Sequence, residues 1–411
     1  MKGLKHMMRN ICSLMMIGLI SMSFGAFAKD KVHKLNAGPW RFELKTTNAN
    51  VPFIMELNWR GKKLEATVLN GKEQIKLKDI IVKGNSISIA LQTYPVTLEL
   101  TAESSELVNG FLVRHNKNPI VKTPLSGHFT KKPRFDGATI EPVQNISGRF
   151  AVNMIDEDDK TNPGVVVFEQ KGTSLTGSIL TPTGDYRYFE GYVSGQDFEA
   201  ASFDGVFFYI FKGKVKKDSL TGSLLTNYKV QIEGQKNNNA DIPDAYAQTQ
   251  LEKFDFTFPD LNGKNVSLSD AKFKHRPVIV QFFGSWCPNC MDELNFLIPW
   301  YRINHKRGID VIALSFERAL DHAGAKIQLA KVQKSKNIPY PLLLAGVSSE
   351  DKPMDKIPTL KNFISFPTTV FLNRKHEVVK VHAGFTGPGT GEFFEKWKRE
   401  FNDTVNDLLK R

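Results

Sequence analysis

The stretch Phe283-Gly-Ser-Trp-Cys-Pro-Asn-Cys-Met-Asp-Glu293 contains Cys287 and Cys290, two of the three cysteines in a chain of 411 residues. Such a Cys-x-x-Cys pair can be a redox couple, a metal site, a haem attachment point or a structural disulfide. A structural zinc site needs four ligands, and no second cysteine pair or closely spaced histidine pair accompanies this one. Haem attachment requires a histidine directly after the second cysteine, where this chain has Met291. A structural disulfide stabilises by closing a long loop, which a two-residue gap does not do.

The redox interpretation agrees with the expected local structure. Residues 277–283 form an apolar run typical of a strand buried on both faces, and a helix is expected to begin near Cys287. The two cysteines then lie one turn apart, with Cβ atoms about 5–6 Å from each other. This spacing suits a disulfide. Cys287, at the helix N-terminus, is the predicted nucleophile because free N–H groups there favour a thiolate. Pro288 is tolerated in the first turn, since its missing N–H has no partner there.

The flanking segments alternate between strand and helix patterns. Residues 254–268 predict a hairpin that turns at Asn262-Gly263. Further strands are expected at 309–314, 342–344, 367–372 and 378–382, and helices at 319–337 and 394–408. Strands that alternate with helices indicate an α/β layered domain.

These residues resemble the thioredoxin superfamily and, within it, the TlpA/ResA-like thiol–disulfide oxidoreductases that act outside the cytoplasm. The resemblance covers about residues 250–411 and rests on the hairpin, Gly-Ser-Trp-Cys-Pro-Asn-Cys, Glu293 and Phe366-Pro-Thr-Thr. It implies a thioredoxin-like fold, catalysis by the cysteine pair and no bound cofactor or metal. One departure is Asn295, where the family commonly has a helix-kinking proline.

The resemblance also implies roles for residues beside the cysteines. Pro367 matches a cis-proline whose neighbouring backbone holds the partner chain, so Phe366, Pro367, Trp286 and Pro288 are the predicted substrate-binding residues. Glu293 matches a proton-handling acidic residue. It lies three positions after Cys290, on the same helical face, and a buried carboxyl there would accept that thiol's proton. The alternative for Glu293 is an ordinary solvated glutamate.

The implied function is reduction of protein disulfides, with oxidised secreted or envelope proteins such as apo-cytochrome c as substrates and a membrane-bound electron donor. Two alternatives stay open. One is a thiol peroxidase, although Gly284 stands where that family usually has threonine, three residues before the reactive cysteine. The other is an envelope binding or scaffold protein in which the N-terminal region recognises a partner and redox activity is secondary.

The N-terminus predicts export. Lys2, Lys5 and Arg9 precede an apolar run that ends at Ala26-Phe27-Ala28, the pattern of a secretory signal cleaved after Ala28. Residues 1–28 are therefore the expected signal peptide and the periplasm the expected location, with membrane anchoring if the signal is retained. Its removal lowers the net charge from +12 to +9. No dense basic cluster stands out, so nucleic-acid binding is not expected.

Between the signal and the α/β domain the chain is rich in short β-patterned runs separated by Gly, Asn, Lys and Asp. Three segment pairs repeat at offsets of 108, 111 and 113, beginning at positions 40, 64 and 107 of the first copy. This spacing indicates a tandem duplication of one antiparallel unit, a barrel or a sandwich. The expected organisation is a multidomain chain with β units at 29–136 and 137–236, a linker at 237–250 and a thioredoxin-like domain at 251–411.

Glu317 and Arg318 follow a predicted central strand. The sequence leaves open whether they reach the rim of the active site or cap the next helix.

Overall fold

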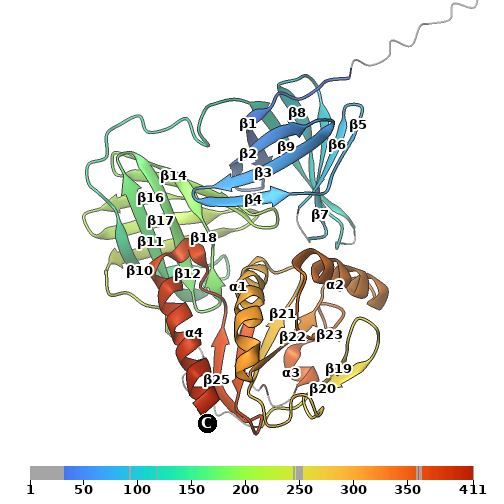
Figure 1. Cartoon of the computed structure of the whole chain (residues 1–411). Coiled ribbons are helices and arrows are strands. Elements are labelled where there is room, and N and C mark those ends of the chain that lie inside the picture. The colour runs from blue at the N-terminus through green and yellow to red at the C-terminus, as the bar shows by residue number, and fades with distance from the viewer. Residues whose placement is uncertain are drawn as a thin grey trace, which may run out of the picture. The chain divides into compact units, whose positions relative to one another are not determined.

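The computed structural model describes residues 32–91, 94–117, 119–243, 246, 253–357, 360 and 363–410 (Figure 1). The expected signal peptide at 1–28 lies outside the described residues. Residues from His33 to Arg411 form one compact unit, to which the following description applies. Among the described residues, no helix combines the length and the apolar character needed to cross a membrane.

The first sheet is an antiparallel arrangement of nine strands in the order β4-β3-β2-β1-β9-β8-β7-β6-β5. In β1, Trp40, Phe42 and Leu44 are buried while the residues between them are more exposed, as the two-residue period of a strand requires. The nine strands are β1 Gly38–Lys45, β2 Asn50–Arg60, β3 Lys63–Asn70, β4 Glu73–Leu77, β5 Ile80–Lys83, β6 Ser86–Ala90, β7 Val96–Ala102, β8 Leu107–Arg114 and β9 Val121–Phe129.

The second sheet is a closed barrel. Its strand order is β11-β10-β18-β17-β16-β15-β14-β12-β13, and pairing of β11 with β12 completes the ring. The strands are β10 Gly148–Ile155, β11 Thr161–Lys171, β12 Ser174–Thr181, β13 Gly184–Asp185, β14 Phe189–Ser194, β15 Asp197–Phe203, β16 Phe208–Lys216, β17 Ser219–Leu225 and β18 Lys229–Lys236. Phe168, Phe198 and Phe211 meet inside the barrel with ring centroids 4.8–5.8 Å apart. Of the two architectures left open by the sequence, this copy adopts the barrel.

The repeated segments occupy equivalent strands in the two sheets. They lie on the first strand of each copy (β1 and β10), the third (β3 and β12) and the eighth (β8 and β17). In each copy the first strand pairs with both the second and the last. The shared topology agrees with the tandem duplication inferred from the sequence.

The C-terminal region is an α/β domain around a five-stranded sheet of order β23-β22-β21-β24-β25, in which β21, β22 and β23 are parallel and β24 and β25 antiparallel. The strands are β19 Thr257–Pro259, β20 Asn265–Ser267, β21 Val278–Phe283, β22 Asp310–Phe316, β23 Leu342–Gly346, β24 Thr368–Leu372 and β25 Val378–Ala383. The helices are α1 Pro288–Asn304, η1 His305–Arg307, α2 His322–Lys336, α3 Pro353–Lys356, η2 Pro388–Thr390 and α4 Glu392–Lys410. The predicted fold class, an all-β N-terminal region followed by a thioredoxin-like domain, is confirmed.

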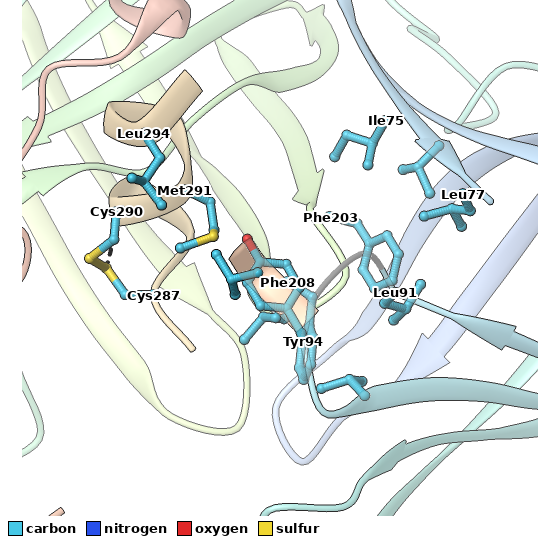
Figure 2. Close-up of a cluster of buried hydrophobic side chains, with 14 of the residues drawn as sticks. Ile75, Leu77, Leu91, Tyr94, Phe203, Phe208, Cys287, Cys290, Met291 and Leu294 are labelled. Carbon is cyan, nitrogen blue, oxygen red and sulfur yellow. Dashed lines mark hydrogen bonds between the residues drawn. A yellow bond between two sulfur atoms is a disulfide. The ribbon is translucent and has the colours of Figure 1, made fainter. Parts of the chain in front are cut away.

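One hydrophobic cluster extends across the β sheets and the α/β domain, beside separate clusters within the barrel and within the α/β domain. A single cluster of buried residues includes Leu91 and Tyr94 of the first sheet region, Phe208 of the barrel and Met291 of α1. Figure 2 shows Met291 lying between the cysteine pair and the β-region side chains Tyr94 and Phe208. The β region is therefore packed against the helix that carries the cysteines.

Candidate active site

The cysteine pair lies at the start of α1, as the sequence predicts. Cys287 is the N-cap residue with an extended backbone, and Cys287 and Cys290 form a disulfide with Cα atoms 5.2 Å apart. The backbone N–H of Cys290 points to the Sγ of Cys287 at 3.2 Å. In the reduced protein, this N–H would favour a thiolate on Cys287.

Burial distinguishes the two sulfurs. Cys287 is 5% exposed and Cys290 is fully buried. Of the two cysteines, only Cys287 therefore has surface that can be reached from outside.

The Phe366–Pro367 segment lies directly beside the disulfide. Its peptide bond is cis, and the carbonyl oxygen of Phe366 is 3.6 Å from the Sγ of Cys287. The Phe366 ring meets Trp286 edge to face, with centroids 5.4 Å apart. Pro288 is buried in the first turn of α1. The four residues predicted to bind substrate thus gather around Cys287, although their role in binding stays a prediction.

Trp286 is held from two directions. Its indole N–H donates to the carbonyl oxygen of Phe316 at 2.9 Å, and the guanidinium of Arg318 lies 3.3 Å from its ring centroid. Glu317 is 2% exposed and accepts hydrogen bonds from the hydroxyl and the backbone N–H of Ser285. Glu317 and Arg318 therefore both contact the loop in front of the cysteines, which is the first of the two possibilities left open by the sequence.

Glu293 is a buried carboxyl rather than a solvated one. It is fully buried and accepts hydrogen bonds from Gln281 Nε2 and Thr369 Oγ1, each at 2.6 Å. Burial raises the pKa of Glu293 to about 7, against the lowering effect of the two hydrogen bonds. Near neutral pH this group can both accept and release a proton.

The barrel supplies a part of the site that sequence reasoning missed. Arg187, in the segment between β13 and β14, forms ion pairs with Glu73 of the first sheet, Asp204 of the barrel and Asp292 of α1. Burial alone would lower the pKa of Arg187, yet the surrounding carboxylates raise it well above its ordinary value. One guanidinium therefore connects both β sheets to the helix that carries the cysteines.

The segment around Arg187 also contacts the α/β domain at Asn289, between the two cysteines, and at Gly387, after β25. Asn289 Nδ2 donates to the carbonyl oxygen of Asp185 at 3.1 Å, and the Asp185 carboxylate accepts from the N–H of Gly387 at 2.5 Å. Burial raises the pKa of Asp292 to about 7, although 17% of its side chain is exposed and Arg187 acts in the lowering direction. No local pattern signals these contacts, since Arg187 and Asp292 are 105 positions apart.

The barrel and the α/β domain enclose a cavity of about 290 Å³ that opens onto the disulfide. Its lining includes Trp286, Cys287 and Phe366 from the α/β domain and Phe207, Tyr209 and Tyr228 from the barrel. No group of three or more metal-ligating side chains was found in the described part of the chain.

Comparisons with known proteins agree with this geometry. The Redoxin family model matches residues 248–393. The thiol-disulfide oxidoreductase ResA of Bacillus subtilis is 29% identical over 129 residues, which are 31% of this chain and 64% of ResA. ResA of Halalkalibacterium halodurans is 26% identical over 162 residues, 38% of this chain and 80% of that protein.

Among solved structures, a thiol:disulfide interchange protein from Chlorobium tepidum is 19% identical, with a TM-score of 0.30, and the match covers 40% of this chain and 99% of that one. The similarity to ResA is confined to the C-terminal region, where the cysteine pair lies. The C-terminal part of the chain is a redoxin-family domain of the ResA/TlpA-like thiol–disulfide oxidoreductase type.

Proposed function

We propose that this protein is an exported thiol–disulfide oxidoreductase that reduces disulfide bonds of proteins outside the cytoplasm. The observation that carries the proposal is the arrangement on α1: Cys287 at the cavity, Cys290 fully buried behind it and Glu293 one turn further along. The signal-like pattern at residues 1–28 supports export, and a periplasmic location follows if the signal is cleaved.

The first step of the proposed cycle is attack by the Cys287 thiolate on one sulfur of a substrate disulfide. The substrate S–S bond breaks, one substrate sulfur leaves as a thiolate that takes up a proton, and the other forms a mixed disulfide with Cys287. The cavity restricts this attack to Cys287, because Cys290 is buried.

In the second step, Cys290 loses its proton and attacks the Sγ of Cys287. The Cys287–Cys290 disulfide forms and the second substrate thiol leaves, so two electrons pass from the protein to the substrate. Glu293, with a pKa of about 7, is the group we assign to accept the Cys290 proton. A membrane-bound thiol reductant would then reduce the protein again.

The test is single-turnover reduction of insulin by the reduced full-length protein, with Cys287→Ser as the inactive control. The reducing direction is tested separately by equilibrating the cysteine pair with glutathione buffers. A reductase is expected to have a potential nearer to about −270 mV, as in thioredoxin, than to the −120 mV or so of an oxidant such as DsbA. If wild type and Cys287→Ser behave alike, the redox proposal fails and a binding role for the β region remains.

Physiological substrates are identified by trapping. In Cys290→Ser the mixed disulfide cannot be resolved, so substrates accumulate on Cys287 in the native compartment. We expect oxidised envelope proteins, with apo-cytochrome c a candidate. Peroxide consumption that depends on Cys287 would indicate a thiol peroxidase instead, and sequencing the mature N-terminus tests cleavage after Ala28.

A further inference from the structure

The cavity over the disulfide has an aromatic side that belongs to the barrel rather than to the redox domain. Phe207, Tyr209 and Tyr228, here called the aromatic wall, line the same cavity as Cys287. Phe207 and Tyr209 stack with centroids 6.0 Å apart. Phe207 is 43% exposed and Tyr228 42% exposed, so both present large apolar surfaces that the fold itself does not cover.

The aromatic wall is held in a fixed position. Asp204 Oδ1 accepts hydrogen bonds from the N–H groups of Val206 and Phe207, each at 2.8 Å, which defines the turn that carries Phe207. Asp204 is in turn paired with Arg187, which is paired with Asp292 on α1. These ion pairs therefore connect the turn that carries Phe207 to the helix that carries the cysteines.

The α/β domain contributes a second aromatic surface to the cavity. Trp286 and Phe366 belong to its lining and meet edge to face, with ring centroids 5.4 Å apart. An aromatic side chain between two aromatic surfaces is favourable.

The size of the cavity limits what can reach the sulfur. About 290 Å³ is at the lower end of ordinary ligand clefts, and Cys287, which belongs to its lining, is only 5% exposed. A folded protein usually docks through a broad surface of about 800 Å² on each partner. A substrate cysteine that lies within such a broad surface is kept away from Cys287. A single extended segment is narrow enough to enter the cavity.

We propose that this cavity is the substrate-binding site and that it selects an extended polypeptide segment in which a large aromatic side chain neighbours the disulfide-bonded cysteine. The inference rests on the proposed function. It assigns the aromatic wall the role of recognising the side chain beside the cysteine, while the bond exchange itself takes place at Cys287 as described above.

The test uses three disulfide probes and the reduced full-length protein in single-turnover stopped flow. The probes are the disulfide-linked dimers of acetyl-Ala-Cys-Phe-Ala-amide and acetyl-Ala-Cys-Ala-Ala-amide, and glutathione disulfide. We expect the phenylalanine peptide to react about two- to tenfold faster than the alanine peptide, the range of a favourable aromatic contact. Glutathione disulfide should be the slowest, because it has no aromatic side chain and its γ-glutamyl linkage and free carboxylates do not form an ordinary extended peptide segment.

The double variant Phe207→Ala/Tyr228→Ala should bring the ratio of the two peptide rates close to one. Both side chains are exposed, so the variant is expected to fold, and its thermal transition checks this. Phe111→Ala is the matched control, because Phe111 is 42% exposed on β8 of the first sheet and does not line the cavity. It should keep the wild-type ratio.

The possible results distinguish failure of the inference about the aromatic wall from failure of the proposed function. Equal peptide rates in wild type, or an unchanged ratio in the double variant, would overturn the aromatic wall as a recognition surface. If glutathione disulfide reacts fastest, the site accepts small disulfides, and the claim that it selects an extended segment is refuted. If none of the three probes reacts while insulin is still reduced through Cys287, the inference fails and the proposed function stands. If insulin is not reduced either, the proposed function fails with it.

Discussion

Glu293→Gln should stabilise the protein above neutral pH and slow its chemistry. The wild-type carboxyl is fully buried with a pKa of about 7, so the folded state holds a proton that the unfolded state releases near 4.5. Below the pKa of Glu293 in the unfolded state, the carboxyl is protonated in both states. It then does not lower the free energy of unfolding. As the pH rises from about 4.5 to about 7 the unfolded state is increasingly favoured, and the loss of stability levels off above 7.

The size of this loss of stability follows from the difference between the pKa values of Glu293 in the folded and unfolded states. At about 1.4 kcal/mol for each pKa unit, the rise from 4.5 to about 7 corresponds to about 3 kcal/mol of lost stability at pH 8, and to less than about 0.5 kcal/mol at pH 4.5. Glutamine has the same shape and no charge. Gln281 Oε1 has no hydrogen-bond partner among the described residues. If the side-chain amide of Gln281 is flipped, this oxygen can accept a hydrogen bond from the amide of the new glutamine.

The assay is urea unfolding of oxidised full-length protein at pH 4.5 and pH 8, followed by tryptophan fluorescence. Glu293→Gln should be more stable than wild type at pH 8 by about 3 kcal/mol and similar to it at pH 4.5. The exposed Glu65→Gln is the control for a charge change alone and should show no such pH-dependent gain.

A kinetic readout accompanies the stability measurement. If Glu293 accepts the Cys290 proton, the mixed disulfide on Cys287 should persist longer in Glu293→Gln, most clearly near pH 7. A variant that gains no more stability at pH 8 than at pH 4.5 would refute the description of Glu293 as a buried group that titrates near neutrality. A gain in stability with unchanged resolution would refute only its role as proton acceptor.

Two other predictions concern the ion cluster and the cysteines. Arg187→Met leaves buried carboxylates without their cation and should cost about 3–5 kcal/mol of stability. The loss in urea unfolding should be smaller at pH 5 than at pH 8, because Asp292, with a pKa of about 7, is protonated at the lower pH. After reduction, iodoacetamide should modify Cys287 well before Cys290, since only Cys287 is exposed at the cavity. Mass spectrometry of the labelled peptides measures this order, and equal labelling would contradict the assigned roles.

The local sequence was enough to predict the redox domain, because the patterns that identify this domain involve residues close together in the chain. An apolar run predicts β21, a Cys-x-x-Cys at a helix start brings two sulfurs within bonding distance, and a three-residue step puts Glu293 on the face of Cys290. The repeated β patterns likewise predicted two related antiparallel units. Only the structure showed that the second closes into a barrel, because closure depends on the pairing of β11 with β12.

Tertiary structure alone decided how the β region relates to the cysteines. Arg187 and Asp292 are 105 positions apart, and the aromatic wall comes from β16 and nearby barrel residues that show no catalytic pattern. The burial that raises the pKa of Glu293 likewise follows from packing of α1 on the sheet, where Gln281 of β21 and Thr369 of β24 meet the carboxyl. Contacts between distant segments follow from how the units pack together, and local periodicity carries no information about that packing.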